Sequence, residues 1–143
     1  MKLSKDLKRT IYFFLGFLYL SGTTEWLLKN FFQVDNGMGP EPTSAEIWIL
    51  RFHGTLSLGV LMLIGYVLRA HVMPSWKVGR EKKSGLALTS YIFAIILSVP
   101  FVMYLTDEKM KATAEQIHAY LGLCLIVPFL FHLLAKKRRV HKN

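Results

Sequence analysis

Four long stretches of the chain contain almost no charged residue, and this feature limits the possible folds more than any other. They are 18, 23, 20 and 19 residues long and cover Ile11–Leu28, Trp48–Ala70, Leu86–Leu105 and Ile117–Ala135. A helix needs about 20 predominantly apolar residues to cross a bilayer. Four such stretches exclude an ordinary soluble domain, and they exclude disorder because a disordered chain has low hydrophobicity. We therefore predict an all-α membrane domain, residues 1–143, that forms a four-transmembrane-helix bundle.

Three of the stretches carry features that bear on the helices they form. The first has a basic start, as a signal peptide does, but Ser21–Leu28 has no A-x-A cleavage site and becomes apolar again. We expect this stretch to be retained as the first helix. Pro100 and Pro128 are expected to kink the third and fourth helices, with the freed carbonyl groups bonded by neighbouring residues.

Basic residues alternate between the segments that connect these stretches. The N-terminal segment, the second connection and the C-terminal tail together hold 14 of the 18 lysine and arginine residues. Lysine and arginine in short loops stay on the cytoplasmic side of a membrane, so we expect both termini to be cytoplasmic. The formal net charge of +9 is then a sign of topology, and it calls for no nucleic-acid partner.

Four of the five histidines lie in or beside two of the predicted helices, at His53, His71, His118 and His132. A helix turns by about 100° per residue. The 18 residues between His53 and His71 therefore place both on one helix face, and the 14 residues between His118 and His132 place those two on one face to within about 40°. Ionisable groups inside a membrane usually face the bundle interior and have a partner. Both helices run in the same direction, so we expect two pairs at matched depths. They are His53 with His118 near the outer surface, and His71 with His132 near the cytoplasmic surface.

Two imidazoles that face each other inside a bundle are typical of bis-histidine ligation of haem b. Haem iron is held by axial side chains, and bundles build cofactor sites from residues on facing helices. Gly54 and Gly122 could give room to the flat macrocycle; the alternative, favoured for any single glycine, is ordinary close packing of membrane helices. Arg51 could pair with a haem propionate, or its charge could reach the lipid headgroups instead. The single cysteine, Cys124, belongs to no C-x-x-C-H motif, so no covalent haem attachment is expected.

The two histidine separations do not match each other, which makes His71 the doubtful ligand. They differ by four residues, or about 6 Å of helix, and a tilt of the second helix could remove the difference. His71 stands just before Met73-Pro74, so the alternative is an interfacial histidine in a loop. For the other three histidines the alternative is hydrogen bonding between helices.

Several short motifs, in their order and spacing, resemble a known family. They are Phe52-His-Gly, Leu68-Arg-Ala-His-Val-Met-Pro-Ser-Trp, Ser84-Gly-Leu-Ala-Leu, Tyr104-Leu-Thr-Asp-Glu and His118-Ala-Tyr-Leu-Gly, with His132 in the last helix. Over about Trp48–Ala135 the chain resembles a small four-helix family of prokaryotic di-haem cytochromes b, akin to the cytochrome b subunits of membrane-bound oxidoreductases. It departs from that family at Leu97-Ser-Val-Pro100, where we expect a Thr-Gly step.

The resemblance implies two haem b groups, with iron bound by His53, His71, His118 and His132, that carry electrons across a prokaryotic plasma membrane. Quinol or quinone is the natural membrane-soluble reactant, and a redox partner protein or larger oxidoreductase complex is expected at the surface. We expect an electron-transfer subunit with no catalytic residue of its own, and quinone oxidoreduction as the activity it could have alone. Two alternatives stay open. One is a non-haem structural or anchor subunit whose histidines join helices, and the other is a protein with one haem.

Overall fold

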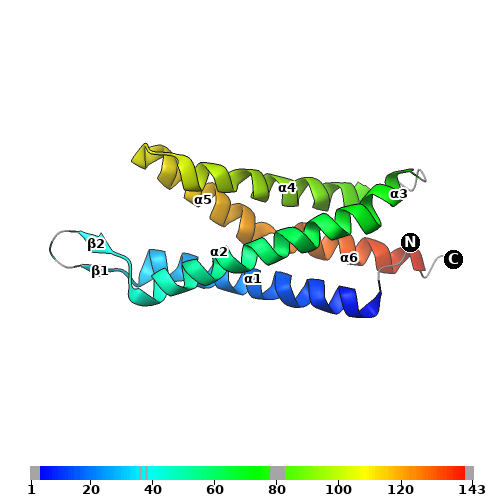
Figure 1. Ribbon diagram of the computed structural model, residues 1–143, viewed down its shortest axis with the longest axis horizontal. Helices are drawn as coiled ribbons and strands as arrows, with labels where there is room; N and C mark the ends of the chain where they lie inside the picture. The colour runs from blue at the N-terminus through cyan, green and yellow to red at the C-terminus, as the bar shows by residue number, and fades with distance from the viewer. Residues whose placement is uncertain (1–3, 36, 38, 78–82, 141–143) are drawn as a thin grey trace. The chain divides into compact units, whose positions relative to one another are not determined.

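The computed structural model describes residues 4–35, 37, 39–77 and 83–140, with the backbone alone for 77 and 136–140. Its elements are α1 (Lys5–Phe31), β1 (Val34–Asp35), β2 (Pro40–Glu41), α2 (Ser44–Val67), the π-helical turn η1 (Leu68–Val72), α3 (Met73–Lys77), α4 (Lys83–Tyr104), α5 (Glu108–Cys124) and α6 (Ile126–Val140) (Figure 1). They form two compact units, which we call unit 1 (Met1–Val78) and unit 2 (Gly79–Asn143).

Four helices are long and apolar enough to cross a membrane, as the sequence predicts. They are Lys5–Phe31, Ser44–Trp76, Lys83–Tyr104 and Glu108–Ala135. The second of these combines α2, η1 and most of α3, and the fourth combines α5 with much of α6. Each helix is longer than the apolar stretch that predicts it, because helices continue into polar sequence where suitable residues cap them.

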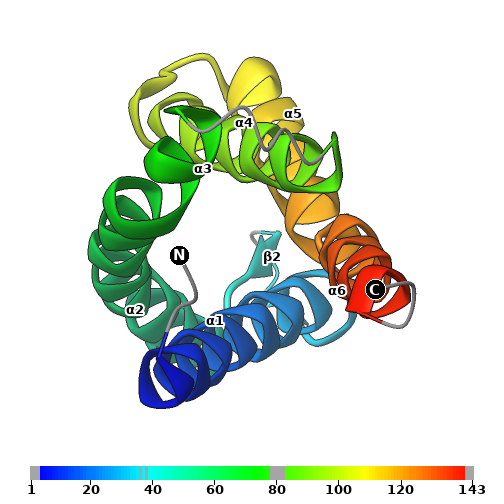
Figure 2. The same cartoon turned by 90° about the vertical axis from the view of Figure 1, so that its right-hand side faces the viewer.

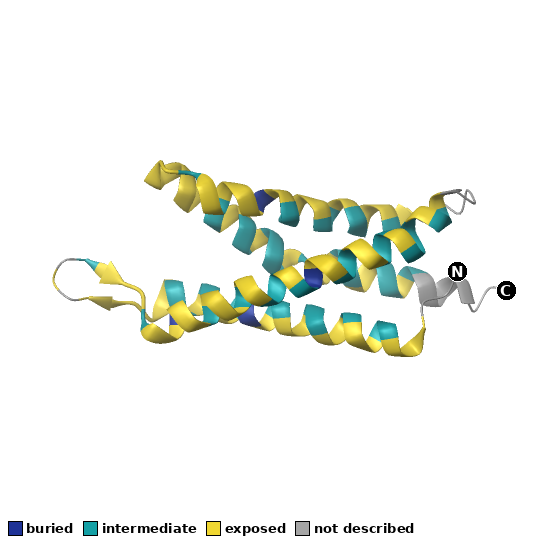
Figure 3. Cartoon of the chain, viewed as in Figure 1, coloured by how far each residue is buried: buried dark blue, intermediate teal, exposed yellow. Residues whose placement is uncertain are grey.

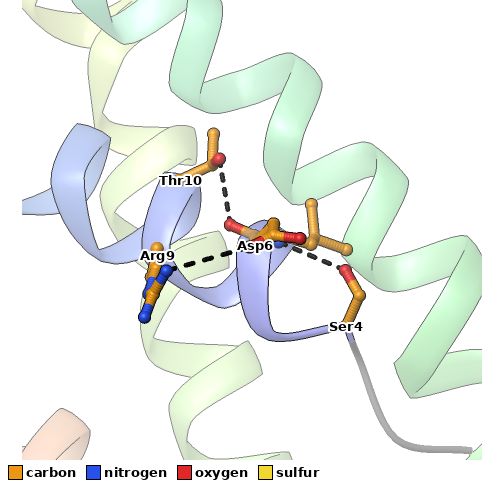
Figure 4. Close-up of polar contacts among 5 residues, drawn as sticks. Ser4, Asp6, Arg9 and Thr10 are labelled. Atoms are coloured by element: carbon orange, nitrogen blue, oxygen red, sulfur yellow. Dashed lines mark hydrogen bonds and ion pairs between the residues drawn. The ribbon is translucent and has the colours of Figure 1, made fainter.

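The helix starts show these caps. The Ser4 side chain accepts a hydrogen bond from the backbone N–H three residues later, at 3.2 Å (Figure 4). Asp6 in the first turn of α1 forms an exposed 4.0 Å ion pair with Arg9, and a negative charge there suits the positive end of the helix dipole. Thr43 and Asp107 cap α2 and α5 in the same way as Ser4 caps α1.

The connection between α1 and α2 contains a short antiparallel hairpin. Val34 pairs with Glu41, and Asp35 pairs with Pro40. The turn between the strands contains Gly37, whose φ of 83° is rarely adopted by residues with a side chain. The Asp35 carboxylate accepts a hydrogen bond from the backbone N–H of this glycine at 2.9 Å, which fixes the start of the turn.

The second long helix does not end at Ala70 but continues through η1 and α3. Within η1 the backbone N–H of Met73 donates to the carbonyl of Leu68, five residues earlier. Pro74 follows directly and has no N–H to donate to Ala70, so the regular α-helical bonding is interrupted at this point. π-helical turns inside α-helices are often found at functional sites. His71 therefore lies in a helical turn and not in a loop.

The fourth long helix is broken between α5 and α6, three residues before Pro128. Leu125 donates its backbone N–H to Gly122 at 3.2 Å, and this shorter bond leaves the carbonyl of Leu121 without its usual helical donor. The hydroxyl of Tyr91 on α4 donates to that carbonyl at 3.0 Å. A neighbouring helix thus satisfies the carbonyl group that the break at Leu125 frees.

Most described residues are exposed or half-buried, and the exposed ones are largely apolar (Figure 3). Large exposed side chains include Phe31, Trp48, Met62 and Tyr104. Of the six buried residues in the described part of the chain, four are polar: Ser21, Glu46, Ser84 and Ser98. This distribution is the reverse of that in a soluble protein, and it is compatible with helices that have lipid around them.

Candidate functional site

In unit 1, His53 is held between α1 and α2, which lie side by side in two views (Figures 1 and 2). Glu46, His53 and Val60 follow one another at seven-residue intervals, so they share one face of α2. Glu46 and Val60 are buried. Opposite this face, the buried Ser21 of α1 places its Oγ 2.9 Å from Nδ1 of His53. The histidine therefore faces the neighbouring helix of its own unit.

Gly22 of α1 allows His53 to approach this closely. A Cβ atom at residue 22 would stand 2.9 Å from Cε1 of the His53 ring and 3.3 Å from Nδ1. Real Cβ atoms almost never come within 3.0 Å of another heavy atom, so any larger residue would force the imidazole to move. Ser21 and Gly22 together form a seat for the ring, with one residue supplying a polar partner and the next supplying space.

In unit 2, His118 has the same kind of partner. The Oγ of Ser98 on α4 lies 2.7 Å from Nδ1 of His118 on α5, and Ser98 is buried. Both units thus contain a serine on the first long helix and a histidine on the second, joined through the same ring nitrogen.

The proton of each serine hydroxyl determines what the histidine can do. Ser21 donates to the carbonyl of Leu18 at 3.0 Å, and Ser98 donates to the carbonyl of Ile95 at 2.6 Å. A hydroxyl has one proton to donate, so in this arrangement the serine oxygen must accept the hydrogen bond from Nδ1–H of the ring. A neutral imidazole with its proton on Nδ1 has its lone pair on Nε2. That tautomer can bind a metal through Nε2.

The other two histidines lie at the opposite ends of their helices. His71 is in η1 and His132 is in α6, and both are half-buried with Nδ1 shielded from solvent. Each expected pair takes one histidine from unit 1 and one from unit 2. The structure therefore does not test the pairing, and both pairs stay predictions.

Arg51 and Gly54 lie on α2, and Gly122 lies on α5. The Arg51 side chain is exposed, and its guanidinium carbon lies 5.2 Å from the centre of the Trp48 ring, a cation–π distance. A Cβ atom at residue 54 or 122 would meet no described heavy atom within 4 Å. The proposed roles of these three residues at a haem stay predictions.

A groove of about 360 Å³ lies between α4 and α5, close to the Ser98–His118 pair. Ser98 itself contributes to the lining, together with apolar side chains that include Phe101, Met110 and Ile117. Such a lining suits an apolar group. Within the described ranges, no cluster of three or more histidine, cysteine, aspartate or glutamate residues could hold a metal ion. An axial pair of histidines needs only two.

Sequence reasoning missed Ser21, Gly22 and Ser98. Ser98 belongs to Leu97-Ser-Val-Pro100, the segment where the resemblance predicts a Thr-Gly step. Small residues inside apolar stretches are the signal that could have identified all three. No protein-family model, curated protein or solved structure matches this chain.

Proposed function

We propose that this protein is a di-haem b membrane cytochrome that moves electrons across a prokaryotic plasma membrane. In this proposal His53 and His118 bind the iron of the outer haem, His71 and His132 bind the iron of the inner haem, and both termini are cytoplasmic. The observation that carries the proposal is the serine partner of Nδ1 in each unit, at 2.9 Å for His53 and 2.7 Å for His118.

The residues present fit haem as axial donors. Histidines that bind metals almost always donate their other ring N–H to a fixed acceptor, which sets the tautomer and the ring orientation. Ser21 and Ser98 provide this acceptor, and Gly22 provides the space that the His53 ring occupies. The bound haem iron would supply a one-electron carrier, whose potential depends on ligands, burial and hydrogen bonding. Arg51 would hold a propionate group.

The electron donor and acceptor must come from outside this chain. The segments that connect the four long helices are short, and the exposed surface of those helices is apolar. A quinol dissolved in the bilayer can reach such a surface directly. A partner protein at the membrane surface would then take or supply the electrons, so the chain acts as a redox subunit.

The same hydrogen bonds also favour a second candidate function. Ser21–His53 joins α1 to α2, and Ser98–His118 joins α4 to α5. Polar side chains that hydrogen-bond across helices stabilise membrane proteins without any cofactor. The protein would then be a non-haem structural or anchor subunit of a membrane complex, in which Nε2 has no ligand to bind.

Haem content separates these two functions. The protein would be purified in detergent from cells supplied with haem precursor, and reduced-minus-oxidised spectra would be recorded with extracted haem counted per chain. The proposal predicts a b-type spectrum and close to two haems per chain. One haem per chain would support the single-haem alternative. Absence of haem would support the second candidate function, a structural or anchor subunit.

A further inference from the structure

Glu46 is a buried acid that the proposed function does not yet use. It is only 7% exposed, and its Oε2 atom is shielded from solvent and has no hydrogen-bond partner in the described part of the chain. Its backbone N–H donates to the Thr43 side chain at 3.1 Å, which caps α2. The cap needs this N–H and does not need Oε2. A buried polar atom that makes no bond is uncommon and calls for an explanation.

The position of Glu46 connects it to the outer histidine. It precedes His53 by seven residues on the same face of α2, which is about 10 Å along the helix. Phe14 of α1 approaches Gly59, and Ser21 of α1 contacts His53. The two helices are antiparallel, so moving seven residues on from Ser21 along α1 and seven residues back from His53 along α2 places Glu46 at the level of Leu28.

The surroundings at this level leave Oε2 available as an acceptor. Leu28 is half-buried and apolar, so it offers the carboxylate no side-chain donor. The nearest charged residues along α1 are Glu25 and Lys29, both half-buried. Neither forms a hydrogen bond with Oε2 of Glu46. A molecule with a hydroxyl group that enters between the helix ends could donate a hydrogen bond to Oε2 of Glu46.

We propose that Glu46 accepts the hydrogen bond of a quinol hydroxyl and takes up its proton during quinol oxidation. This inference rests on the proposed function, which supplies the electron acceptor. Oxidation of one quinol to quinone breaks two O–H bonds and releases two protons and two electrons. One proton forms an O–H bond with Oε2 of Glu46 and is later released to water at the outer surface. The second proton goes to water directly, and the two electrons would be taken up by the haems that His53, His71, His118 and His132 would hold.

The test is the rate at which decylubiquinol reduces the purified oxidised protein. Glu46→Gln keeps the size of the side chain and the backbone N–H that the cap uses, but an amide cannot take up the quinol proton as a carboxylate does. Loss of a positioned proton acceptor typically slows a reaction by about 100-fold or more. We expect a loss of this order in Glu46→Gln and a smaller loss in Glu46→Asp, which keeps a carboxylate. Glu41→Gln, at an exposed acid of β2, is the matched control and should react like the wild type.

Two further measurements separate the possible failures. Haem content and reduction by dithionite should be the same in all variants, because neither depends on a quinol proton. A wild type that holds haem but is not reduced by decylubiquinol would overturn this inference alone. A Glu46→Gln variant that reacts at the wild-type rate, or one that loses haem, would overturn it as well. A wild type without haem would overturn the proposed function itself.

Discussion

The Oγ of Ser98 lies 2.7 Å from Nδ1 of His118, and the same hydroxyl donates its proton to the carbonyl of Ile95 at 2.6 Å. While the hydroxyl donates its proton to that carbonyl, the imidazole is the donor in the Ser98–His118 contact. Nε2 of His118 is left with its lone pair. Ser21 and His53 repeat the arrangement in unit 1. The two contacts lead to the first predictions.

Ser98→Ala removes the acceptor of Nδ1–H, so the ring is no longer held in one tautomer. Loss of such a partner typically weakens metal binding by about 10- to 100-fold. We expect the variant to lose haem to apomyoglobin faster than the wild type, by a factor in this range. Ser98→Thr keeps the hydroxyl and should lose haem more slowly than Ser98→Ala.

The matched control is Ser57→Ala. Ser57 also donates to the carbonyl three residues earlier, at 2.7 Å, so this variant removes a similar backbone bond. Equal haem loss in Ser57→Ala and Ser98→Ala would mean that Ser98 has no particular effect on His118.

Gly22→Ala places a methyl group where the His53 ring lies, 2.9 Å from Cε1. The ring must shift, and with it the atom proposed to bind iron. We expect the outer haem to be lost or its absorption bands to change. Gly16→Ala on the same helix is the control, since a Cβ there meets no described atom within 4 Å. If both variants give the wild-type spectrum, the approach of Gly22 to His53 is irrelevant to haem.

Tyr91→Phe removes the hydroxyl that donates to the Leu121 carbonyl at 3.0 Å. Hydrogen bonds between membrane helices are worth about 0.6 kcal/mol on average and up to about 1.7 kcal/mol. We expect Tyr91→Phe to reduce the free energy of unfolding by an amount within this range, which would be seen as a lower thermal midpoint of the protein in detergent. Tyr104→Phe should leave the midpoint unchanged, because that side chain is 79% exposed. A midpoint for Tyr91→Phe equal to that of the wild type would show that the bond does not stabilise the break.

The orientation predicted by the basic residues can be measured with single cysteines in a Cys124→Ser background. A membrane-impermeant maleimide should label Asp35→Cys, in the hairpin between α1 and α2, in intact cells. It should label Lys83→Cys, at the exposed start of α4, only after the cells are opened. The reverse pattern would place the termini on the outside.

The four long helices could be predicted because each needs only a local run of apolar residues. Their ends could not be predicted from hydrophobicity, since caps such as Ser4, Thr43 and Asp107 lie in polar sequence. The π-helical turn at His71 was also missed. Although Pro74 signals a disturbance in the helix, it does not by itself tell a loop from a widened helical turn.

The four histidines stood out in the sequence because ionisable groups are rare inside a membrane. Their serine partners did not, since serine is common in membrane helices and its role depends on the register between two helices. Ser21 and His53 are 32 residues apart, and Ser98 and His118 are 20 apart. Helix periodicity places each residue on a face of its own helix, but it does not fix the register between helices.

The most direct test of the central claim is the haem content of two double variants. His53→Ala/His118→Ala removes both ligands of one proposed haem, whereas His53→Ala/His132→Ala removes one ligand from each. The account predicts close to two haems per chain in the wild type, one in the first double variant and almost none in the second. Equal haem content in the two double variants, or a wild type without haem, would contradict it.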